Sequence, residues 1–282
     1  MIRVILVLIT YFLVKSDNQG LQPNIVVILA DDLGFGDLSV HPFTGSGIYT
    51  PELEKMALSG SILNNFHSAA PVCTPARASI LTGLYPWRMN IKSIYGTGIQ
   101  ANDHLHVTNN IPILLSANGY HTAHVGKWHL GGLTPKDIMM RKNNPYDCNT
   151  TKPGPNQHGY LEYVSMMEGP ESPRLKYLLP TKSLYSKGSK YLLKNDNPYP
   201  VPNDVLTNVQ TNEAIRIMKE CVHSKKRFYI HLAYDAPHSP WEVIPGNWTR
   251  QYKSLWYSDL KSNKENRAFK YATMVIINKF YP

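Results

Sequence analysis

The segment CTPAR at residues 73–77 places a nucleophilic thiol four residues before a guanidinium. Pro75 suits the first turn of a helix, so we expect a helix that runs through residues 76–81 and carries the Cys73 side chain at its amino terminus. The backbone N–H groups and the dipole at that end favour a bound anion. The segment therefore predicts a nucleophile at an anion site with Arg77 nearby, and a buried, inert thiol is the alternative.

A second candidate is the acidic pair Asp31 and Asp32, which ends an apolar run in the segment NIVVILADDLGFGD at residues 24–37. The run of apolar and β-branched residues predicts a buried strand, and the glycines after the pair predict a turn. Ligands of open α/β sheets bind beyond the carboxyl ends of the strands. The pair is therefore placed for a cation, and helix capping or a loop turn is the alternative.

Basic side chains follow another predicted strand in the segment GYHTAHVGKWHLG at residues 119–131. We expect a short strand over residues 122–125, with Lys127 and His129 after its end. A lone Lys-x-His pair normally faces solvent. The flanking glycines and tryptophan make this pattern more specific, so both side chains are candidate site residues.

A histidine follows a third predicted strand, which spans residues 227–234. His238 lies in the segment APHSP at residues 236–240. Because imidazole titrates near neutral pH, this residue suits proton transfer, and a capping or solvated loop histidine is the alternative. Asp235 and His231 are weaker candidates in the same segment.

In this order, these segments resemble the amino-terminal half of type I sulfatases, members of the alkaline phosphatase superfamily. The Cys-x-Pro-x-Arg pattern at residues 73–77 is the one that the family's activating enzyme reads when it oxidises a cysteine to formylglycine. The likeness runs from about Pro23 to about Val275. It is strongest at residues 24–60, 68–88 and 111–131, with a shorter block at residues 236–240. The resemblance implies hydrolysis of a sulfate ester.

The resemblance also implies a role for each candidate. Cys73 becomes formylglycine, whose aldehyde hydrates to a geminal diol, and one hydroxyl attacks sulfur. Arg77 holds the formylglycine and the oxygens near the metal in place. Lys127 and His129 match residues that contact the sulfate and the diol. His238 matches the histidine that protonates the leaving oxygen.

One calcium ion is implied by the same resemblance, with Asp31, Asp32 and the modified Cys73 as ligands. Calcium suits oxygen sites with carboxylates and lowers the cost of ionising the diol. Sulfatases complete this shell with an Asp-Asn pair on a later strand and add a second lysine, and neither is visible in this sequence. Residues 196–197 form an Asp-Asn pair but lie in a polar, proline-flanked segment before His238, so we reject them.

Half of a carboxylate shell should bind calcium weakly. We therefore expect the chain to be a fragment of a sulfatase, truncated before the later strands and the carboxy-terminal subdomain and inactive by itself. In this interpretation, residues 23–282 form one incomplete catalytic domain.

The elements that position these residues alternate between strand and helix. We expect helices over residues 50–60, 111–118 and 206–222, each between predicted strands. Such alternation predicts a parallel sheet covered by helices, and the resemblance implies an alkaline-phosphatase-like α/β fold with a mostly parallel sheet. Residues 133–203 show no sustained period and are rich in Pro, Asn, Tyr and Gly. We predict long loops and short elements over the sheet there, which carry the substrate specificity.

The composition supports a globular protein with a single core. The chain has 282 residues, of which 43% are hydrophobic, and mixed charges argue against disorder. The formal net charge of +9 suits an anionic substrate such as a sulfated glycan. We expect no nucleic-acid partner.

The first 16 residues have the layout of a secretory signal peptide. Arg3 precedes an apolar run over residues 4–14, which is too short to span a bilayer, so we expect no stable membrane anchor. This predicts the secretory pathway, with a lysosomal or extracellular destination. The resemblance to sulfatases implies the formylglycine-generating enzyme as a partner during maturation.

Secretion gives context to two further features. Asn149 and Asn247 each begin an N-glycosylation acceptor pattern. Cys148 and Cys221 either form a disulfide in an oxidising compartment or stay as two unpaired thiols.

Three functions are consistent with these patterns. The first is a sulfatase that acts on an aryl sulfate or a sulfated carbohydrate. The second is a phosphatase or phosphodiesterase of the same superfamily, although those enzymes use Ser or Thr with zinc. The third is a truncated, inactive pseudosulfatase that binds sulfated glycans through Lys127, His129 and the basic surface. An aldehyde at position 73 distinguishes the first from the second, and binding without turnover identifies the third.

Overall fold

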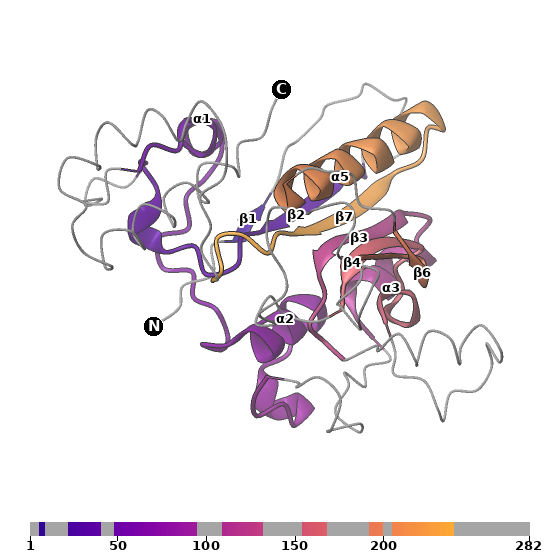
Figure 1. The fold of residues 1–282 in the computed structure, drawn as a ribbon, viewed down its shortest axis with the longest axis horizontal. Helices are drawn as coiled ribbons and strands as arrows, with labels where there is room; N and C mark the ends of the chain where they lie inside the picture. The colour runs from indigo at the N-terminus through magenta and orange to yellow at the C-terminus, as the bar shows by residue number, and fades with distance from the viewer. Residues whose placement is uncertain are drawn as a thin grey trace.

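The protein is built around one mostly parallel sheet, seen in a computed structural model (Figure 1). The structure describes residues 6–8, 22–40, 48–94, 109–131, 154–167, 192–199 and 205–239. The sheet has seven described strands in the order β1-β2-β7-β3-β4-β5-β6. Their bounds are β1 Leu6–Leu8, β2 Ile25–Leu29, β3 His121–Lys127, β4 Glu162–Met166, β5 Leu192–Lys194, β6 Asn197–Pro198 and β7 Phe228–Ala233.

The four central strands are parallel, and the strands at the two edges are antiparallel. β2, β7, β3 and β4 pair in parallel, whereas β1 pairs antiparallel with β2, and β5 and β6 form an antiparallel hairpin beside β4. The register places Leu29 and Gly126 opposite Ala233. The carboxyl ends of β2, β3 and β7 therefore lie at one level, and the side chains that follow these strands meet at one edge of the sheet.

Gly126 permits the close approach of β3 to β7 at this edge. It has a φ of 110°, and a Cβ atom at this position would lie 1.9 Å from the carbonyl oxygen of Ala233. Only glycine combines this conformation with that contact. The tight contact fixes the level at which Lys127, the next residue, ends its strand.

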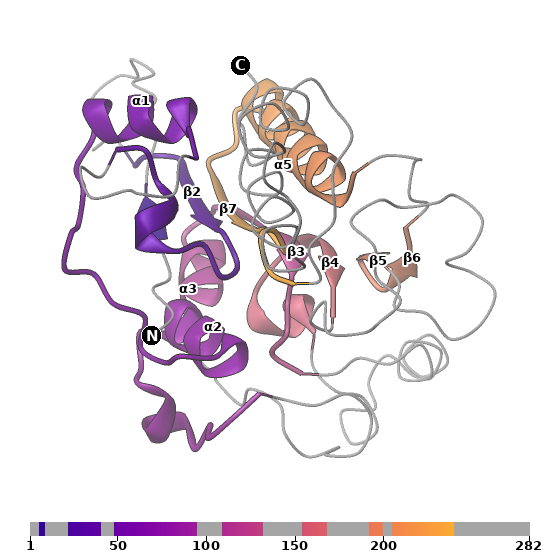
Figure 2. The same ribbon diagram turned by 60° about the vertical axis from the view of Figure 1, so that its left-hand side comes forward.

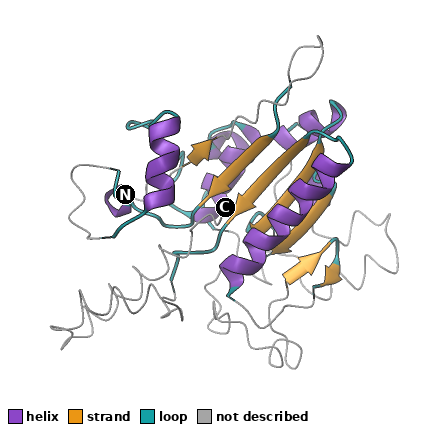
Figure 3. Ribbon diagram, turned by 90° about the horizontal axis from the view of Figure 1, so that it is seen from above, coloured by secondary structure: helices purple, strands orange, loops and turns teal. Residues whose placement is uncertain are grey.

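Four described α-helices accompany the sheet, with α5 along one face and α2 and α3 on the opposite face (Figures 1 and 3). α1 lies toward the β2 side of the molecule (Figure 2). The α-helices are α1 Pro51–Ser59, α2 Cys73–Thr82, α3 Ile111–Ala117 and α5 Leu206–His223. Short 3-10 helices are η1 Phe35–Asp37, η2 Pro86–Met89 and η3 Pro155–His158.

The two faces of the sheet bury different side chains. The core beneath α5 is largely aliphatic and includes Ala123, Val125, Ala214, Ile217, Ile230 and Leu232. The core beneath α2 and α3 is rich in aromatic rings and includes Leu81, Tyr120, Trp128, Tyr160, Tyr163 and Tyr229. Both faces of the central strands are therefore covered, as parallel sheets require.

Most predicted elements are confirmed. Proline and glycine mark the ends of α1 as expected, and the Asn110 side chain caps α3 by accepting a hydrogen bond from Ile113 N at 2.9 Å. For residues 133–203, the described elements are short as predicted, but their predicted place over the sheet was wrong. β4 is a parallel strand inside the sheet, and β5 and β6 extend the sheet, so this region supplies strands as well as loops.

Several sequence predictions fall wholly or partly outside the described residues. Within the predicted signal peptide, only residues 6–8 are described, and they form β1 beside β2. Cys148, Asn149 and Asn247 lie outside the described ranges, so the disulfide and glycosylation remain predictions. Cys221 is buried in α5. Among the described residues, no helix combines the length and apolar character needed to cross a membrane.

Candidate active site

Asp31 is the centre of the polar cluster at the carboxyl edge of the sheet. Its buried carboxylate accepts a hydrogen bond from Lys127 Nζ at Oδ2, at 2.5 Å, and Arg77 Nη2 lies 3.4 Å from the same oxygen. Burial raises the pKa of this carboxyl, but the charges of Arg77, Lys127 and His238 outweigh that effect and lower the pKa to about 2. Asp31 is therefore ionised at neutral pH.

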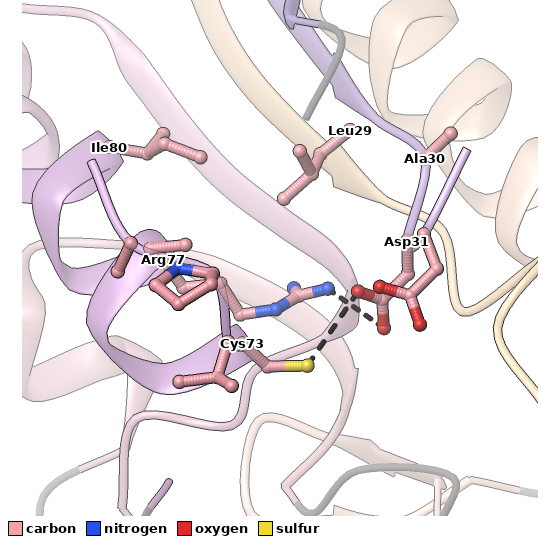
Figure 4. A pocket seen from close by; sticks show the side chains of 11 residues that line it. Leu29, Ala30, Asp31, Cys73, Arg77 and Ile80 are labelled. Atoms are coloured by element: carbon pink, nitrogen blue, oxygen red, sulfur yellow. Dashed lines mark hydrogen bonds and ion pairs between the residues drawn. The ribbon is translucent and has the colours of Figure 1, made fainter. Parts of the chain in front are cut away.

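Cys73 is the first residue of α2 and faces Asp31 across the edge of the sheet (Figure 4). Its thiol lies 3.8 Å from Asp31 Oδ1, and Lys127 Nζ donates to the sulfur at 3.3 Å. Val72, the N-cap, provides no side-chain cap hydrogen bond to the helix. The expectation that Cys73 lies at the amino terminus of a helix is confirmed.

Two buried hydrogen bonds join α2 to the end of β3. Arg77 Nη1 donates to the carbonyl oxygen of Lys127 at 2.6 Å, and Thr74 Oγ1 donates to that of His129 at 2.8 Å. Both donors lie in the first two turns of α2. These bonds hold the nucleophile helix at a fixed position relative to the basic side chains of β3.

Lys127 and His129 differ slightly from the sequence prediction. Lys127 is the last residue of β3 rather than a residue after it, because the strand is longer than expected, and its side chain is fully buried. His129 is also buried and has a left-handed φ of 56°, with its N–H donating to Met167 O at 3.2 Å. The structure thus brings Lys127 directly to Asp31 and Cys73, and fixes His129 through its backbone.

His238 reaches the same cluster from the segment after β7. Its Nε2 lies 3.5 Å from Asp32 Oδ2, and its Nδ1 donates to the carbonyl oxygen of Ser239 at 2.5 Å. Burial lowers the pKa of this imidazole, but hydrogen bonds to Cys73 and to Ser239 and the charge of Asp31 raise it, with a net value of about 9. His238 therefore lies close to the acidic residues and the thiol.

Backbone contacts fix this segment against β2. Asp31 N donates to the carbonyl oxygen of Ala236 at 3.2 Å, and Tyr234 N donates to that of Leu29 at 2.8 Å. The peptide bond between Ala236 and Pro237 is cis. The pairing of β2 with β7 thus continues past the strand ends and brings the acidic pair and the histidine together.

Asp32 has a different environment from its neighbour. It is partly exposed and has a left-handed φ of 65°. Burial and the charge of Asp31 raise the pKa of its carboxyl. The two adjacent aspartates therefore differ in exposure and in the direction in which their pKa values are shifted.

Asp235 belongs to this cluster although the sequence ranked it as weaker. It is fully buried directly after β7, and Gln210 Nε2 of α5 donates to its Oδ2 at 2.6 Å. Burial raises its pKa to about 6, against the opposing effects of Lys127 and Gln210. Its position at the end of the strand that pairs with β2 is the signal that favours it.

Two other residues considered in the sequence lie elsewhere. His231 is buried within β7, where its Nδ1 pairs with the Tyr160 hydroxyl at 3.1 Å. Asp196 lies in the turn between β5 and β6 and accepts a hydrogen bond from the Tyr163 hydroxyl at 2.5 Å. The hairpin is at the opposite end of the strand order from β2, in agreement with our rejection of Asp196 as a calcium ligand.

A small pocket opens beside the cluster (Figure 4). Its volume is about 330 Å³, counting the space that is open to solvent. Its lining comes from the end of β2, the segment before α2 and the first turns of α2, and includes Asp31, Asp32, Val72, Cys73, Arg77 and Ile80. The thiol and both carboxylates therefore border this pocket.

Comparison with known proteins places the whole described core in one family. The family model described as Sulfatase matches residues 23–273. Arylsulfatase J of Mus musculus is 29% identical over 235 residues, which cover 83% of this chain and 35% of that protein. N-acetylgalactosamine-6-sulfatase of Canis lupus familiaris is 29% identical over 234 residues, which cover 77% of this chain and 40% of that protein. The chain thus spans less than half of the length of these curated relatives.

Solved structures agree with this assignment. The crystal structure of Ps i-CgsB in complex with k-i-k-neocarrahexaose superposes with a TM-score of 0.65 at 25% identity, over 91% of this chain and 53% of that one. BT4656 in complex with its substrate D-glucosamine-2-N,6-O-disulfate shares the fold, with a TM-score of 0.58 at 20% identity, over 85% of this chain and 38% of that one. From the family match and the fold together, this chain belongs to the sulfatase family.

Proposed function

We propose that this protein hydrolyses sulfate monoesters of carbohydrates or aryl alcohols. One observation carries the proposal: in a chain of the sulfatase family, the Cys73 thiol lies at the start of α2 in contact with both Asp31 and Lys127. A nucleophile, an anion-binding helix end and a buried cation meet there, which is the set that transfer of a sulfuryl group requires.

Position 73 supplies the nucleophile in this proposal. The formylglycine-generating enzyme oxidises the Cys73 thiol to an aldehyde, and a hydroxyl of the hydrated aldehyde is the attacking group. Lys127 donates to the side chain at this position and to Asp31, so it holds the attacking atom against the acidic residue. Arg77, Lys127 and the backbone donors of α2 offset the negative charge of the sulfate.

The leaving alcohol needs a proton, and His238 is the proposed donor. It lies beside Cys73 and Asp32, and its bond to the Ser239 carbonyl orients the ring with Nε2 toward the site. His129 is the proposed further contact to the sulfate. Its buried position next to α2 supports that role.

The chemistry of the donors fits a calcium ion. Asp31 and Asp32 offer adjacent carboxylates, Asp31 stays ionised, and Asp31 Oδ1 faces position 73, where maturation replaces sulfur by oxygen. These three positions would hold the ion. When bound, calcium would supply positive charge that favours the ionised form of the attacking hydroxyl.

A sulfated glycan or aryl sulfate is the proposed substrate class. The names of the relatives include arylsulfatases and an N-acetylgalactosamine-6-sulfatase, and the net charge of +9 suits an anionic ligand. We further propose passage through the secretory pathway to a lysosomal or extracellular destination, where glycans of this kind occur.

The deciding experiment is to co-express the chain with the formylglycine-generating enzyme and to analyse the peptide that contains position 73 by mass spectrometry. We expect the mass of the aldehyde, and trapping by a hydrazide. The peptide with Cys221 is the internal control and should keep its thiol mass. A thiol that persists at position 73, while a known sulfatase is converted in the same cells, would refute the proposal.

Turnover is measured on the native protein from its own cells. We expect release of sulfate from an aryl sulfate and at least about 100-fold slower release of phosphate from the matching aryl phosphate. The opposite preference would favour a phosphatase, and glycan binding with an aldehyde but no turnover would favour an inactive binding protein.

A further inference from the structure

Before its oxidation, Cys73 forms a set of metal donors that differs from the set proposed for calcium. Ligand atoms of Asp31, Cys73 and His238 all lie within 4.8 Å of one another. They are a carboxylate oxygen, a sulfur and an imidazole nitrogen. We propose that the unmodified chain binds one zinc ion through these three side chains, with water as the fourth ligand.

The distances are close to those of a tetrahedral zinc site. Zinc bonds of ~2.0 to 2.3 Å at tetrahedral angles place neighbouring ligand atoms roughly 3.3 to 3.7 Å apart. Cys73 Sγ lies 3.8 Å from Asp31 Oδ1. All three ligand atoms lie within 4.8 Å of one another, so zinc binding requires side-chain rotations that shorten the longer separations.

The histidine is oriented for ligation. In the neutral ring, donation from His238 Nδ1 to the Ser239 carbonyl places the lone pair on Nε2. A backbone carbonyl that accepts from the second ring nitrogen is the usual support of a histidine ligand in a zinc site. Nε2 lies 3.5 Å from Asp32 Oδ2, so this nitrogen is the one that faces the acidic residues.

The charges around the donors also permit a divalent ion. Arg77 and Lys127 contact Oδ2 of Asp31, whereas Oδ1 faces the thiol, and the sulfur itself also accepts a hydrogen bond from Lys127 Nζ at 3.3 Å. These two cations are opposed by the carboxylates of Asp31 and Asp32 and, after metal binding, by a thiolate. Zinc takes Cys73 as the thiolate and His238 as the neutral imidazole, so any proton on the sulfur or on Nε2 is released to solvent when the ion binds. The pocket beside Cys73 gives the ion a path to the donors.

Maturation should therefore change which metal the site prefers. Sulfur and nitrogen ligands select zinc, whereas a site with only oxygen ligands favours calcium. Oxidation of Cys73 removes the sulfur and introduces oxygen. This part of the inference rests on the proposed function, because it takes position 73 as the residue that matures.

The test uses the full chain made in cells that lack the formylglycine-generating enzyme, with the thiol at position 73 verified by mass. Co2+ is titrated as a spectroscopic probe of the zinc site, and Zn2+ is then added to displace it. We expect a thiolate-to-cobalt charge-transfer band and the visible bands of tetrahedral cobalt, both abolished by Zn2+. The Cys73→Ser variant should lose the charge-transfer band, and His238→Gln should bind Co2+ at least about tenfold more weakly.

Matched controls come from α5. Cys221→Ser removes the other described cysteine, and His223→Gln removes an exposed histidine, so both should bind Co2+ as the unchanged chain does. Circular dichroism of each variant verifies that it is folded. Absence of the band in the folded chain with an intact thiol, or its persistence in Cys73→Ser, would overturn the zinc site.

The outcomes separate this inference from the proposed function. A zinc site without conversion of Cys73 in co-expressing cells would uphold the site and remove the sulfatase chemistry. Conversion of Cys73 to the aldehyde without cobalt binding by the thiol form would uphold the sulfatase chemistry and overturn the zinc site. If both hold, the converted chain should bind Zn2+ at least about tenfold more weakly than the thiol form.

Discussion

The two faces of the central sheet carry different kinds of side chain. Beneath α5, the strands present aliphatic side chains such as Ile230 and Leu232. Beneath α2, the same strands present His124, His231 and a group of aromatic rings, with the His124 and His231 rings 5.1 Å apart. Successive residues of one strand point to opposite faces, so β7 serves both. The α5 face supplies stability by apolar burial, whereas the α2 face combines burial with a polar network directly below the candidate site.

The largest expected effect concerns the α2 face and leaves the fold intact. Replacement of Cys73 by Ser should reduce sulfate release by at least about 1,000-fold, because serine gives no aldehyde. Thermal unfolding should change little, since the side chain is only partly buried at the start of α2. If the Cys73→Ser protein retains the turnover of the unchanged protein, Cys73 is not the source of the nucleophile.

A large effect on stability alone is expected on the α5 face. Ile230→Ala should lower the free energy of unfolding by about 2 to 5 kcal/mol, because the side chain is fully buried beneath α5. Ile230→Val should lower it by about 0.5 to 1.5 kcal/mol. Urea unfolding measures both, and turnover per folded molecule should be unchanged. A loss of turnover without a loss of stability would contradict the division between the faces.

The polar network of the α2 face should make folding sensitive to acid. Burial, assisted by the charge of Arg77, lowers the pKa of His231 from 6.5 to about 3. Its neighbours are His124, whose pKa is also lowered, and the Tyr160 hydroxyl. As the pH falls from 6.5 toward 3, the unfolded chain takes up a proton that the folded chain does not, so stability decreases.

Substitution of this histidine tests that account. In His231→Gln, the loss of stability between pH 7 and pH 5 should be roughly 2 kcal/mol smaller than in the unchanged chain. Urea unfolding at the two pH values gives the difference. An identical loss in both proteins would assign the acid sensitivity to other groups.

The smallest expected effect lies at the partly exposed end of β4. His121, with Arg216 and Lys194, lowers the pKa of Glu162 to about 2 against the effect of burial. The pairing therefore contributes stability above pH 4.5, and this contribution is lost as the pH falls toward 2. Glu162→Gln should cost less than about 1 kcal/mol at pH 7, because solvent screens these pairs. A larger loss in the free energy of unfolding, measured with urea, would show that this polar cluster contributes as much stability as apolar burial on the α5 face.

Sequence patterns predicted elements with strong local signals and missed those that depend on tertiary contacts. The β2 strand has a continuous apolar run, and α1 has both a proline near its start and a glycine at its end. β4, with the sequence EYVSM, has a weak period of its own and is stabilised as a strand by pairing with β3.

The candidate site shows the same division. Each of three site residues lies in a motif that is contiguous in sequence, and the structure brings these motifs together; the residues are Cys73, Lys127 and Asp31. Asp235 has no motif of its own, and the hydrogen bond that its carboxylate accepts comes from Gln210 of α5. The register of β2 with β7 sets its position, which no local pattern specifies.

The junction between α2 and β3 has an evolutionary consequence. Arg77 and Thr74 donate to main-chain carbonyl groups of Lys127 and His129 rather than to their side chains. Every amino acid offers the same carbonyl acceptor, so substitutions at positions 127 and 129 leave the acceptors in place. Substitutions during evolution can therefore change the side chains at these two positions of the candidate site while α2, which carries Cys73, keeps its main-chain anchor.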